Sequence, residues 1–204
     1  MPKKGYEALS NTRREEIEEK AMRLYLDNKY EDITLKMLLD ALSLHPTTFY
    51  RYFYDKDELY LHLIEITLRK LDKYFQENSE GGYDLMTQFS GPCSLSDLEV
   101  DFSKTLLDAP SYILLRSYYE VYKDTLFDRY KEILGKLRLE GKLRPDVDED
   151  LTSYMYATSM FNLLMFYKDH GIKDTETLKK MKKYLFFSFF PYGLMNEKPA
   201  DETN

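Results

Sequence analysis

The 204-residue sequence predicts an all-α protein with about nine helices. Apolar residues recur at three- and four-residue spacing along most of the chain, and the strict alternation typical of half-buried β-strands does not appear. The eight Gly and seven Pro are few for an all-β protein with many tight turns. Hydrophobic residues make up 43% and charged residues 32% of the chain, which predicts a buried core with a well solvated surface.

Composition also limits the cellular and chemical context. The single cysteine, Cys93, excludes a disulfide framework within the chain and a zinc site built from several cysteines. The charged first residues, Met1 to Glu7, do not resemble a signal peptide. The most apolar stretches, residues 154–167 and 184–190, are shorter than the roughly 18 residues of a membrane span. We therefore expect a cytoplasmic protein that does not use a membrane as a partner.

The charge balance constrains any nucleic-acid surface. The formal net charge is −7, and residues 1–60 contain ten Lys or Arg against twelve Asp or Glu. Such a balance disfavours a broadly basic DNA-binding face. A DNA-binding surface would have to be a local patch, with the acidic groups kept on other faces.

The first helix is expected to begin at Thr12, because Thr12 and Glu15 have the spacing of a capping box. Asn28 can adopt the left-handed conformation that ends such a helix. The apolar positions between them follow helical spacing and predict one buried face: Ile17, Ala21, Leu24 and Tyr25.

Two short helices should follow. Thr34 is the expected N-cap of the first, whose buried side would be formed by Leu35, Leu38, Leu39 and Leu42. Pro46 disfavours helix at His45 but suits the first position of the next helix, which should reach Phe53. The turn between the two helices has the three- or four-residue length of a helix-turn-helix.

The rest of the chain is also expected to be helical. Asp55, with Glu58 three residues later, predicts the start of a long amphipathic helix to about Tyr74. The Gly- and Pro-containing segment 79–94 is expected to be a loop, and Gly141 and Gly171 are expected to end helices. Further helices are predicted over residues 95–107, 111–140, 148–170 and 175–190, with Asp148 as a cap.

In a helix-turn-helix the second helix enters the major groove with its first residues against the base edges. Those residues here are Pro46, Thr47 and Thr48, and a threonine can hydrogen-bond to bases or touch the thymine methyl group. Arg51 would reach a base or a phosphate, and His45 would either contact DNA or only cap the helix. Backbone contacts are expected from Thr34, Lys36, Tyr50 and Lys56, and a mobile basic arm from Lys3 and Lys4.

Three runs, residues 33–39, 44–53 and 56–59, resemble the DNA-binding domain of TetR/AcrR transcriptional regulators. Residues 48–59 follow the T-L-Y-x-Y-F-x-x-K-E-x-L run common in that family, and the resemblance by motif covers about residues 10–63. The chain departs from the family pattern at Leu39 (usually Ala), Ser43 (usually Gly), His45 (usually Ser or Thr) and Thr47 (often Gly).

The resemblance implies a homodimer with a DNA-binding domain at residues 1–55 and a ligand-binding and dimerisation domain at residues 56–204. The last two helices would pair with their mates in a four-helix bundle, and a small-molecule effector held by the middle helices would release the DNA operator. The resemblance also implies that Thr34, Tyr50 and Lys56 hold phosphates.

The aromatic residues of the second half are open to two interpretations. Most should pack in the core, yet some could line a ligand pocket in which Arg116 anchors an anion. The candidate pocket residues are Phe102, Leu106, Arg116, Tyr119 and Tyr122. The last predicted helix is apolar nearly all round, which favours burial in a dimer. The candidate interface residues are Tyr154, Phe161, Leu185, Phe186 and Phe189.

These observations favour a dimeric, ligand-responsive transcriptional regulator, most often a repressor in the family that the chain resembles. The alternative is a protein of the same fold that acts as a protein-interaction module without binding DNA. The sequence contains no evident nucleophile–base pair, metal-ligand cluster or Gly-rich phosphate loop. We therefore expect no enzymatic activity, no cofactor and no metal.

Overall fold

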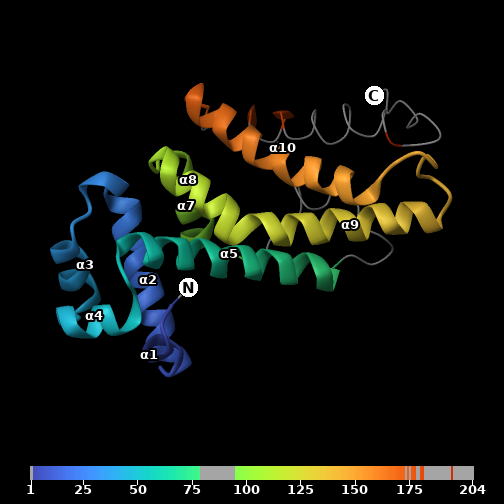
Figure 1. The fold of residues 1–204 in the computed structure, drawn as a ribbon. Helices are drawn as coiled ribbons and strands as arrows, with labels where there is room; N and C mark the ends of the chain where they lie inside the picture. Colours follow the sequence, from blue (N-terminus) through green and yellow to red (C-terminus); the bar gives the residue numbers. More distant parts are fainter. Residues whose placement is uncertain are drawn as a thin grey trace. The chain divides into compact units, whose positions relative to one another are not determined.

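The computed structural model describes residues 2–78 and 95–172, together with positions 174, 176, 177, 180, 181 and 194. Among these residues no β-strand occurs, which confirms the all-α prediction. The elements follow one another in this order (Figure 1): α1 (Lys4–Glu7), α2 (Asn11–Asp27), the 3₁₀ turn η1 (Tyr30–Asp32), α3 (Leu35–Leu42), α4 (Pro46–Tyr52), α5 (Lys56–Asn78), α7 (Asp97–Lys104), the 3₁₀ turn η2 (Thr105–Leu107), α8 (Ser111–Ser117), the π-helix η3 (Tyr118–Tyr122), α9 (Lys123–Leu139) and α10 (Glu149–Asp169).

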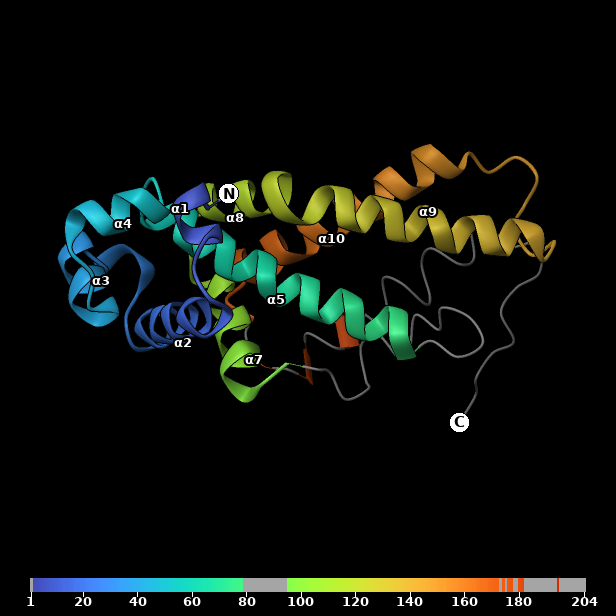
Figure 2. The ribbon, with the colours of Figure 1, turned by 90° about the horizontal axis from the view of Figure 1, so that it is seen from below.

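The described helices belong to two compact units. The first contains α1 to α5 and α7 to η3, and the second contains α9 and α10. Within the first unit, α1 packs against α4, α2 packs against α3 and α7, and α8 packs against α5. Figures 1 and 2 both show α3 and α4 next to each other, with α1 beside α4. The short helices thus gather around the start of the long helix α5.

An apolar core joins the helices of the first unit. Its fully buried side chains come from five helices and from the residue directly after α4: Ile17, Leu38, Phe49, Phe53, Leu59, Leu63 and Phe102. The ring centroids of Tyr25 and Tyr60 lie 4.8 Å apart, and those of Tyr60 and Phe102 lie 5.4 Å apart, both edge to face. Removal of these side chains from water, at about 25 cal/mol per Å² of apolar surface, drives the packing, and the aromatic geometry adds to it.

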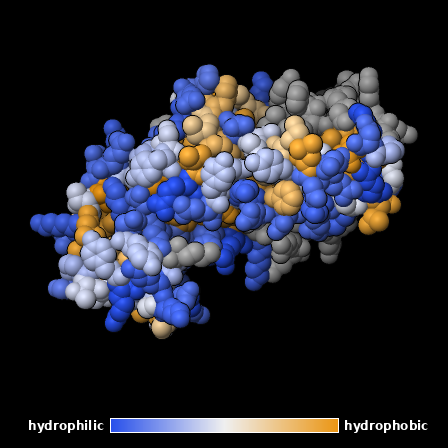
Figure 3. All heavy atoms as spheres, viewed as in Figure 1, coloured by the Kyte–Doolittle hydropathy of each residue, from blue (hydrophilic) through white to orange (hydrophobic). Residues whose placement is uncertain are grey.

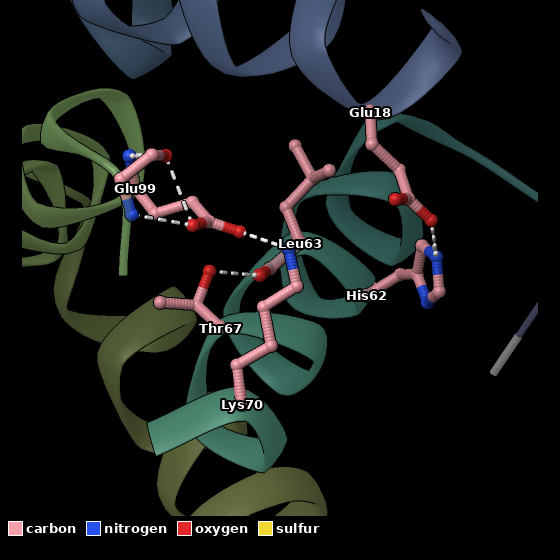
Figure 4. Close-up of polar contacts among 7 residues, drawn as sticks. Glu18, His62, Leu63, Thr67, Lys70 and Glu99 are labelled. Carbon is pink, nitrogen blue, oxygen red and sulfur yellow. Dashed lines mark hydrogen bonds and ion pairs between the residues drawn. The ribbon is translucent and has the colours of Figure 1, made fainter. Parts of the chain in front are cut away.

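Polar side chains connect α2 and α7 to α5 (Figure 4). Glu18 of α2 lies 3.3 Å from Nε2 of His62, and Lys70 of α5 forms an ion pair with Glu99 of α7. Glu99 also accepts hydrogen bonds from Ser96, which caps α7. Burial acts to raise the pKa of Glu99, but the hydrogen bonds from Lys70 and Ser96 outweigh it and lower the pKa. The carboxylate therefore stays ionised next to Lys70.

Several predicted helix ends are confirmed. The hydroxyl group of Thr34 accepts a hydrogen bond from the Met37 amide at 3.2 Å and caps α3. Asp55 accepts from the amide of Glu58 at 2.8 Å at the start of α5. Asp148 caps α10 in the same way. These caps use contacts three residues apart, which is why the sequence pattern reveals them.

Two predictions about the first long helix are wrong. Its N-cap is Ser10 and not Thr12, because the Ser10 hydroxyl accepts from the amide of Arg13 at 3.3 Å. At the other end, Asn28 has extended backbone angles (φ −137°, ψ 149°) and not left-handed ones. Its side-chain amide donates to the carbonyl of Leu24 at 3.0 Å, which satisfies an orphan carbonyl of the last turn without a left-handed residue.

The predicted helical stretch 111–140 contains an irregularity that the sequence did not locate. The π-helix η3 (Tyr118–Tyr122) interrupts the α-helical hydrogen bonding between α8 and α9. Such wide turns insert a residue into a helix and often occur at functional sites. Pro110 lies at the N-cap of α8, where its missing N–H costs nothing.

In the second unit, α9 and α10 form a packed pair. The rings of Tyr130 and Tyr156 lie 4.8 Å apart between them. The guanidinium group of Arg138 donates to the Glu149 carboxylate and to the carbonyls of Arg144 and Val147, so it holds the connection between the two helices. Gly141 and Gly171 have the positive φ expected of residues that end helices.

The predicted loop 79–94, with Cys93, and most of the predicted helix 175–190 lie outside the described residues. Within the described part of the chain, no helix is both long enough and apolar enough to span a membrane.

Candidate nucleic-acid interface

A tight turn orients α4 relative to α3. Ser43 adopts the left-handed conformation (φ 53°, ψ 47°), and the amide of Leu44 donates to the carbonyl of Leu39 at 3.0 Å. This geometry ends α3 and reverses the chain, a role usually given to glycine because a side chain in this conformation costs about 1 kcal/mol or more. Pro46 then occupies the first turn of α4, where its fixed φ suits the helix.

Helix α4 has one buried and one exposed side. Phe49, Tyr52 and Phe53 are almost fully buried and pack into the core of the first unit. The opposite side exposes five of the predicted DNA-binding residues to solvent: His45, Pro46, Thr47, Tyr50 and Arg51. The helix therefore presents its polar side outward from its first turn to its last.

The other predicted DNA-binding residues differ in their availability. Thr34 and Lys36 are exposed on α3. Thr48 is half-buried, and Lys56 is engaged within the protein, where its ammonium donates to the carbonyls of Tyr30 at 3.0 Å and Ile33 at 2.9 Å. An ammonium group has three N–H donors, so a phosphate contact by Lys56 would use the one that remains.

The segment that contains α4 carries no acidic residue of its own. Residues 41–54 contain no Asp or Glu, whereas α2 carries a series of glutamates. On α2, Glu16 pairs with Lys20 at 2.7 Å and Glu19 pairs with Arg23 at 2.7 Å. Helix α4 itself therefore adds no negative charge to its exposed side, in spite of the overall negative charge of the chain.

The N-terminal residues are placed differently from the expected mobile arm. Lys3 donates from its ammonium to the carbonyl of Tyr50 at 2.8 Å, and from its backbone amide to the carbonyl of Tyr52 at 2.8 Å. Its ammonium also lies 3.6 Å from the ring centroid of Tyr54, an exposed aromatic residue that the sequence reasoning missed. The prediction of a mobile arm is therefore wrong for Lys3, because α4 offers unpaired carbonyls within its reach.

The candidate ligand residues differ in their exposure to solvent. Phe102 and Leu106 are buried in the core, whereas Tyr119 is 57% exposed. Tyr122 is half-buried, and burial raises its pKa to about 12. Arg116 pairs with Glu120 at 2.7 Å and lies 3.5 Å from Asp57 at the start of α5. The hydrogen bond from Arg116 to Glu120 raises the pKa of the guanidinium group, which stays charged.

A cleft of about 410 Å³ opens among α2, α5 and α7. Its lining includes Glu15, Glu18, Glu19, Met22, Arg23, Lys70, Ser96, Leu98 and Glu99. None of the predicted ligand residues lines this cleft, and the sequence pattern pointed only to the aromatic residues further along the chain. Within the described residues, no group of three or more His, Cys, Asp or Glu side chains is arranged to hold a metal ion.

The candidate dimer residues are described only in part. Tyr154 is 46% exposed on α10, and Phe161 is half-buried. Leu185, Phe186 and Phe189 lie outside the described residues. Next to Tyr154, the same helix exposes Leu151 at 59% and Met155 at 52%. Figure 3 shows hydrophobic residues at the surface over α10.

The fold is similar to those of solved TetR-family transcriptional regulators. One from Pectobacterium atrosepticum matches with a TM-score of 0.62 and 16% sequence identity over 92% of this chain and 96% of that chain. SmeT, the repressor of the Stenotrophomonas maltophilia multidrug efflux pump SmeDEF, matches with a TM-score of 0.60 and 14% identity over 95% and 94% of the two chains. No protein-family model matches the sequence, and no curated protein matches it. At these identities the likeness is one of fold.

Proposed function

We propose that this protein is a dimeric, cytoplasmic transcriptional regulator that represses its target genes until a small-molecule effector releases it from its DNA operator. One observation carries the proposal. The left-handed turn at Ser43 and the buried residues Phe49 and Phe53 hold α4 so that Pro46 and Thr47 face outward at its amino end. In helix-turn-helix proteins this is the part of the second helix that meets base edges.

The chemistry of that exposed side fits duplex DNA. Thr47 offers a hydroxyl group and a methyl group to base edges, and Arg51 offers a fork of donors to a guanine or a phosphate. Tyr50, Thr34 and Lys36 would contact the phosphate backbone and position the helix. The fold is similar to that of SmeT, a repressor, which supports repression rather than activation.

Dimerisation is part of the proposal because DNA offers equivalent major-groove surfaces one helical turn apart. The apolar residues that α10 leaves exposed, Leu151, Tyr154 and Met155, would be covered by a second copy of the chain. Two α4 helices would then reach neighbouring turns of the duplex. The spacing between them decides affinity.

Effector control would act through α5, which begins four residues after α4 ends. Asp57 in the first turn of α5 lies 3.5 Å from Arg116 of α8, so a ligand that moves α8 would also move the start of α5 and, with it, α4. The coupling must be reciprocal: operator DNA weakens effector binding by the same factor by which the effector weakens DNA binding.

The proposal is tested with fluorescence anisotropy on labelled duplexes from the DNA that flanks the protein's own gene. We expect saturable binding. The logarithm of the association constant should fall linearly with the logarithm of the salt concentration. Binding equal to that of a scrambled duplex, or none, would favour a protein-interaction module on the same fold, the alternative that the acidic composition supports.

Thr47→Ala tests base readout. Thr47 is exposed, so its removal should leave the stability of the protein within about 0.5 kcal/mol of the wild type. We expect relaxed preference at one base pair, a loss of about 1–3 kcal/mol of discrimination there, measured by selection from a random duplex pool. Lys29→Ala, an exposed change outside α3 and α4, serves as control. An unchanged selected sequence for Thr47→Ala would remove this residue from the base contacts.

A further inference from the structure

The last turn of α4 contains backbone carbonyls that the helix itself cannot satisfy. Helix α4 has only seven residues, and isolated helices of this length are unstable in water. The carbonyl groups of its final turn need partners from outside the helix. Two of these carbonyls, those of Tyr50 and Tyr52, accept hydrogen bonds from Lys3, a residue 47 positions away from Tyr50.

Lys3 makes three contacts with this turn. Its ammonium donates to Tyr50 O at 2.8 Å, its amide donates to Tyr52 O at 2.8 Å, and its charge lies 3.6 Å from the centroid of the Tyr54 ring. A positive charge at the carboxyl end of a helix also interacts favourably with the helix dipole. Lys3 therefore acts as an external C-cap for α4.

Gly5 allows the N-terminal segment to approach this closely. A Cβ atom at position 5 would lie 2.8 Å from the Cγ atom of Arg51 and 2.8 Å from its carbonyl oxygen. The oxygen belongs to the backbone of α4 and cannot move without moving the helix. Only glycine permits the observed contact between α1 and α4.

Tyr6 anchors the segment to the rest of the unit. Its side chain is 2% exposed, and its ring centroid lies 4.9 Å from that of Phe53, directly after α4. Its hydroxyl group donates to Glu18 of α2 at 2.7 Å, and the same carboxylate oxygen lies 3.3 Å from Nε2 of His62 on α5. The N-terminal segment is thus fixed to two long helices while it holds the end of α4.

We propose that residues Lys3 to Tyr6 form a strap that positions the recognition helix α4, and that Lys3 and Gly5 set its DNA affinity and base preference without contacting DNA. This inference rests on the proposed function. Base readout tolerates little displacement, because hydrogen bonds weaken steeply once distance and angle depart from their optimum. Loss of the strap would leave α4 held by its buried residue Phe49 but would remove the hydrogen bonds of Lys3 to the carbonyls of its last turn.

The competing interpretation of Lys3 is an ordinary phosphate contact. The two roles predict different salt dependences, since each phosphate contact contributes about one unit to the slope of log K against log salt. Loss of a positioning residue lowers the affinity for DNA and leaves the slope of log K against log salt unchanged. Lys4 is the matched control, because it is the adjacent lysine and is exposed on α1.

The first experiment uses the free, full-length protein and amide hydrogen exchange of the peptide that covers residues 49–54. We expect Lys3→Ala to speed exchange there by about tenfold, whereas Lys4→Ala leaves it unchanged. Exchange in α2 and α9 should stay at the wild-type rate in both variants. Equal exchange in Lys3→Ala and wild type would overturn the strap. This readout needs no DNA, so it decides the inference even where the protein binds none and the proposed function fails.

The second experiment measures DNA binding and its dependence on salt. For Lys3→Ala we expect about tenfold weaker binding to the selected operator with an unchanged salt slope. A slope lowered by about one would show that Lys3 contacts a phosphate, which would overturn the positioning role. Gly5→Ala keeps every charge and should both speed exchange in residues 49–54 and alter the sequence selected from a random duplex pool.

Gly135→Ala is the control for the glycine change, because a Cβ there meets only a carboxylate oxygen at 4.0 Å. It should select the wild-type sequence. The sequence selection separates positioning from a purely structural role, since a general loss of stability would lower the amount of active protein and leave its base preference intact. An unchanged selected sequence and unchanged exchange for Gly5→Ala would refute the strap.

Discussion

Helices α2 and α4 belong to the same compact unit, but they are stabilised differently. α2 has 17 residues and carries its own ion pairs, in which Glu16 binds Arg13 and Lys20, and Glu19 binds Arg23. α4 has seven residues and no acidic residue with which to form such pairs. Its contacts come from a turn before it, a core beneath it and the N-terminal segment beyond it. A short helix that keeps its outer side free for a partner has to be held by other parts of the protein.

The largest expected effect tests the core beneath α4. Phe49→Ala removes a fully buried ring and leaves a cavity, so we expect the free energy of unfolding to fall by about 3–5 kcal/mol. Chemical denaturation followed by circular dichroism measures it. Tyr50→Ala, on the exposed side of the same helix, should change stability by only about 0.5 kcal/mol. Equal losses for the two variants would contradict the two-sided description of α4.

A smaller change in stability is expected from a comparison of the turn before α4 with the start of α2. Ser43→Gly relieves a left-handed residue and should stabilise the protein by about 1 kcal/mol. The same chemical change at Ser10, an N-cap with extended backbone, should cost a few tenths of a kcal/mol. Thermal unfolding would show midpoints that move in opposite directions. A lower midpoint for Ser43→Gly would mean that the serine side chain contributes more than its backbone strain costs.

The smallest expected effect concerns the surface pairs of α2. Hydrogen bonds from Lys20 and Arg13 lower the pKa of Glu16 below its ordinary value. A lowered pKa in the folded state means that the pairs stabilise the protein above the unfolded value of about 4.3, and that this contribution is lost as the pH falls through the folded value. Glu16→Gln should therefore lower the thermal midpoint slightly at pH 7 and not at pH 3.

Glu15→Gln is the control for this experiment, because in the described structure Glu15 is exposed and makes no ion pair. A large midpoint change for Glu16→Gln at pH 7 would show that α2 depends on its exposed pairs more strongly than solvent-screened charges usually allow.

The helical architecture of the described residues was predictable because its signals are local. Thr34, Asp55 and Asp148 cap helices through contacts three residues away, and Pro46 marks a helix start by its own ring. The wrong prediction of the start of α2 also has a local cause, because two residues could cap this helix. Ser10 and Thr12 offer the same hydroxyl chemistry two residues apart, and the spacing of Thr12 and Glu15 favoured the wrong one.

The sequence predicted which residues form the candidate interface, but not how far each of them is exposed. The helix-turn-helix pattern placed Pro46, Thr47 and Thr48 at the start of the second helix, but it did not show that Thr48 is half-buried or that Lys56 donates to two carbonyls. Burial depends on what packs against a helix. The 3.6-residue period gives only the relative directions of the side chains.

The amino-acid sequence by itself determined the helical class, most helix ends, and the turn that separates α3 from α4, because hydrogen bonds within about four residues decide those features. Only the tertiary structure decided that Lys3 lies on the end of α4, that Tyr6 meets Glu18, and that Arg116 lies near Asp57. These pairs join residues far apart in the chain. Each depends on the core that holds its helices together, so no local pattern in the sequence predicts it.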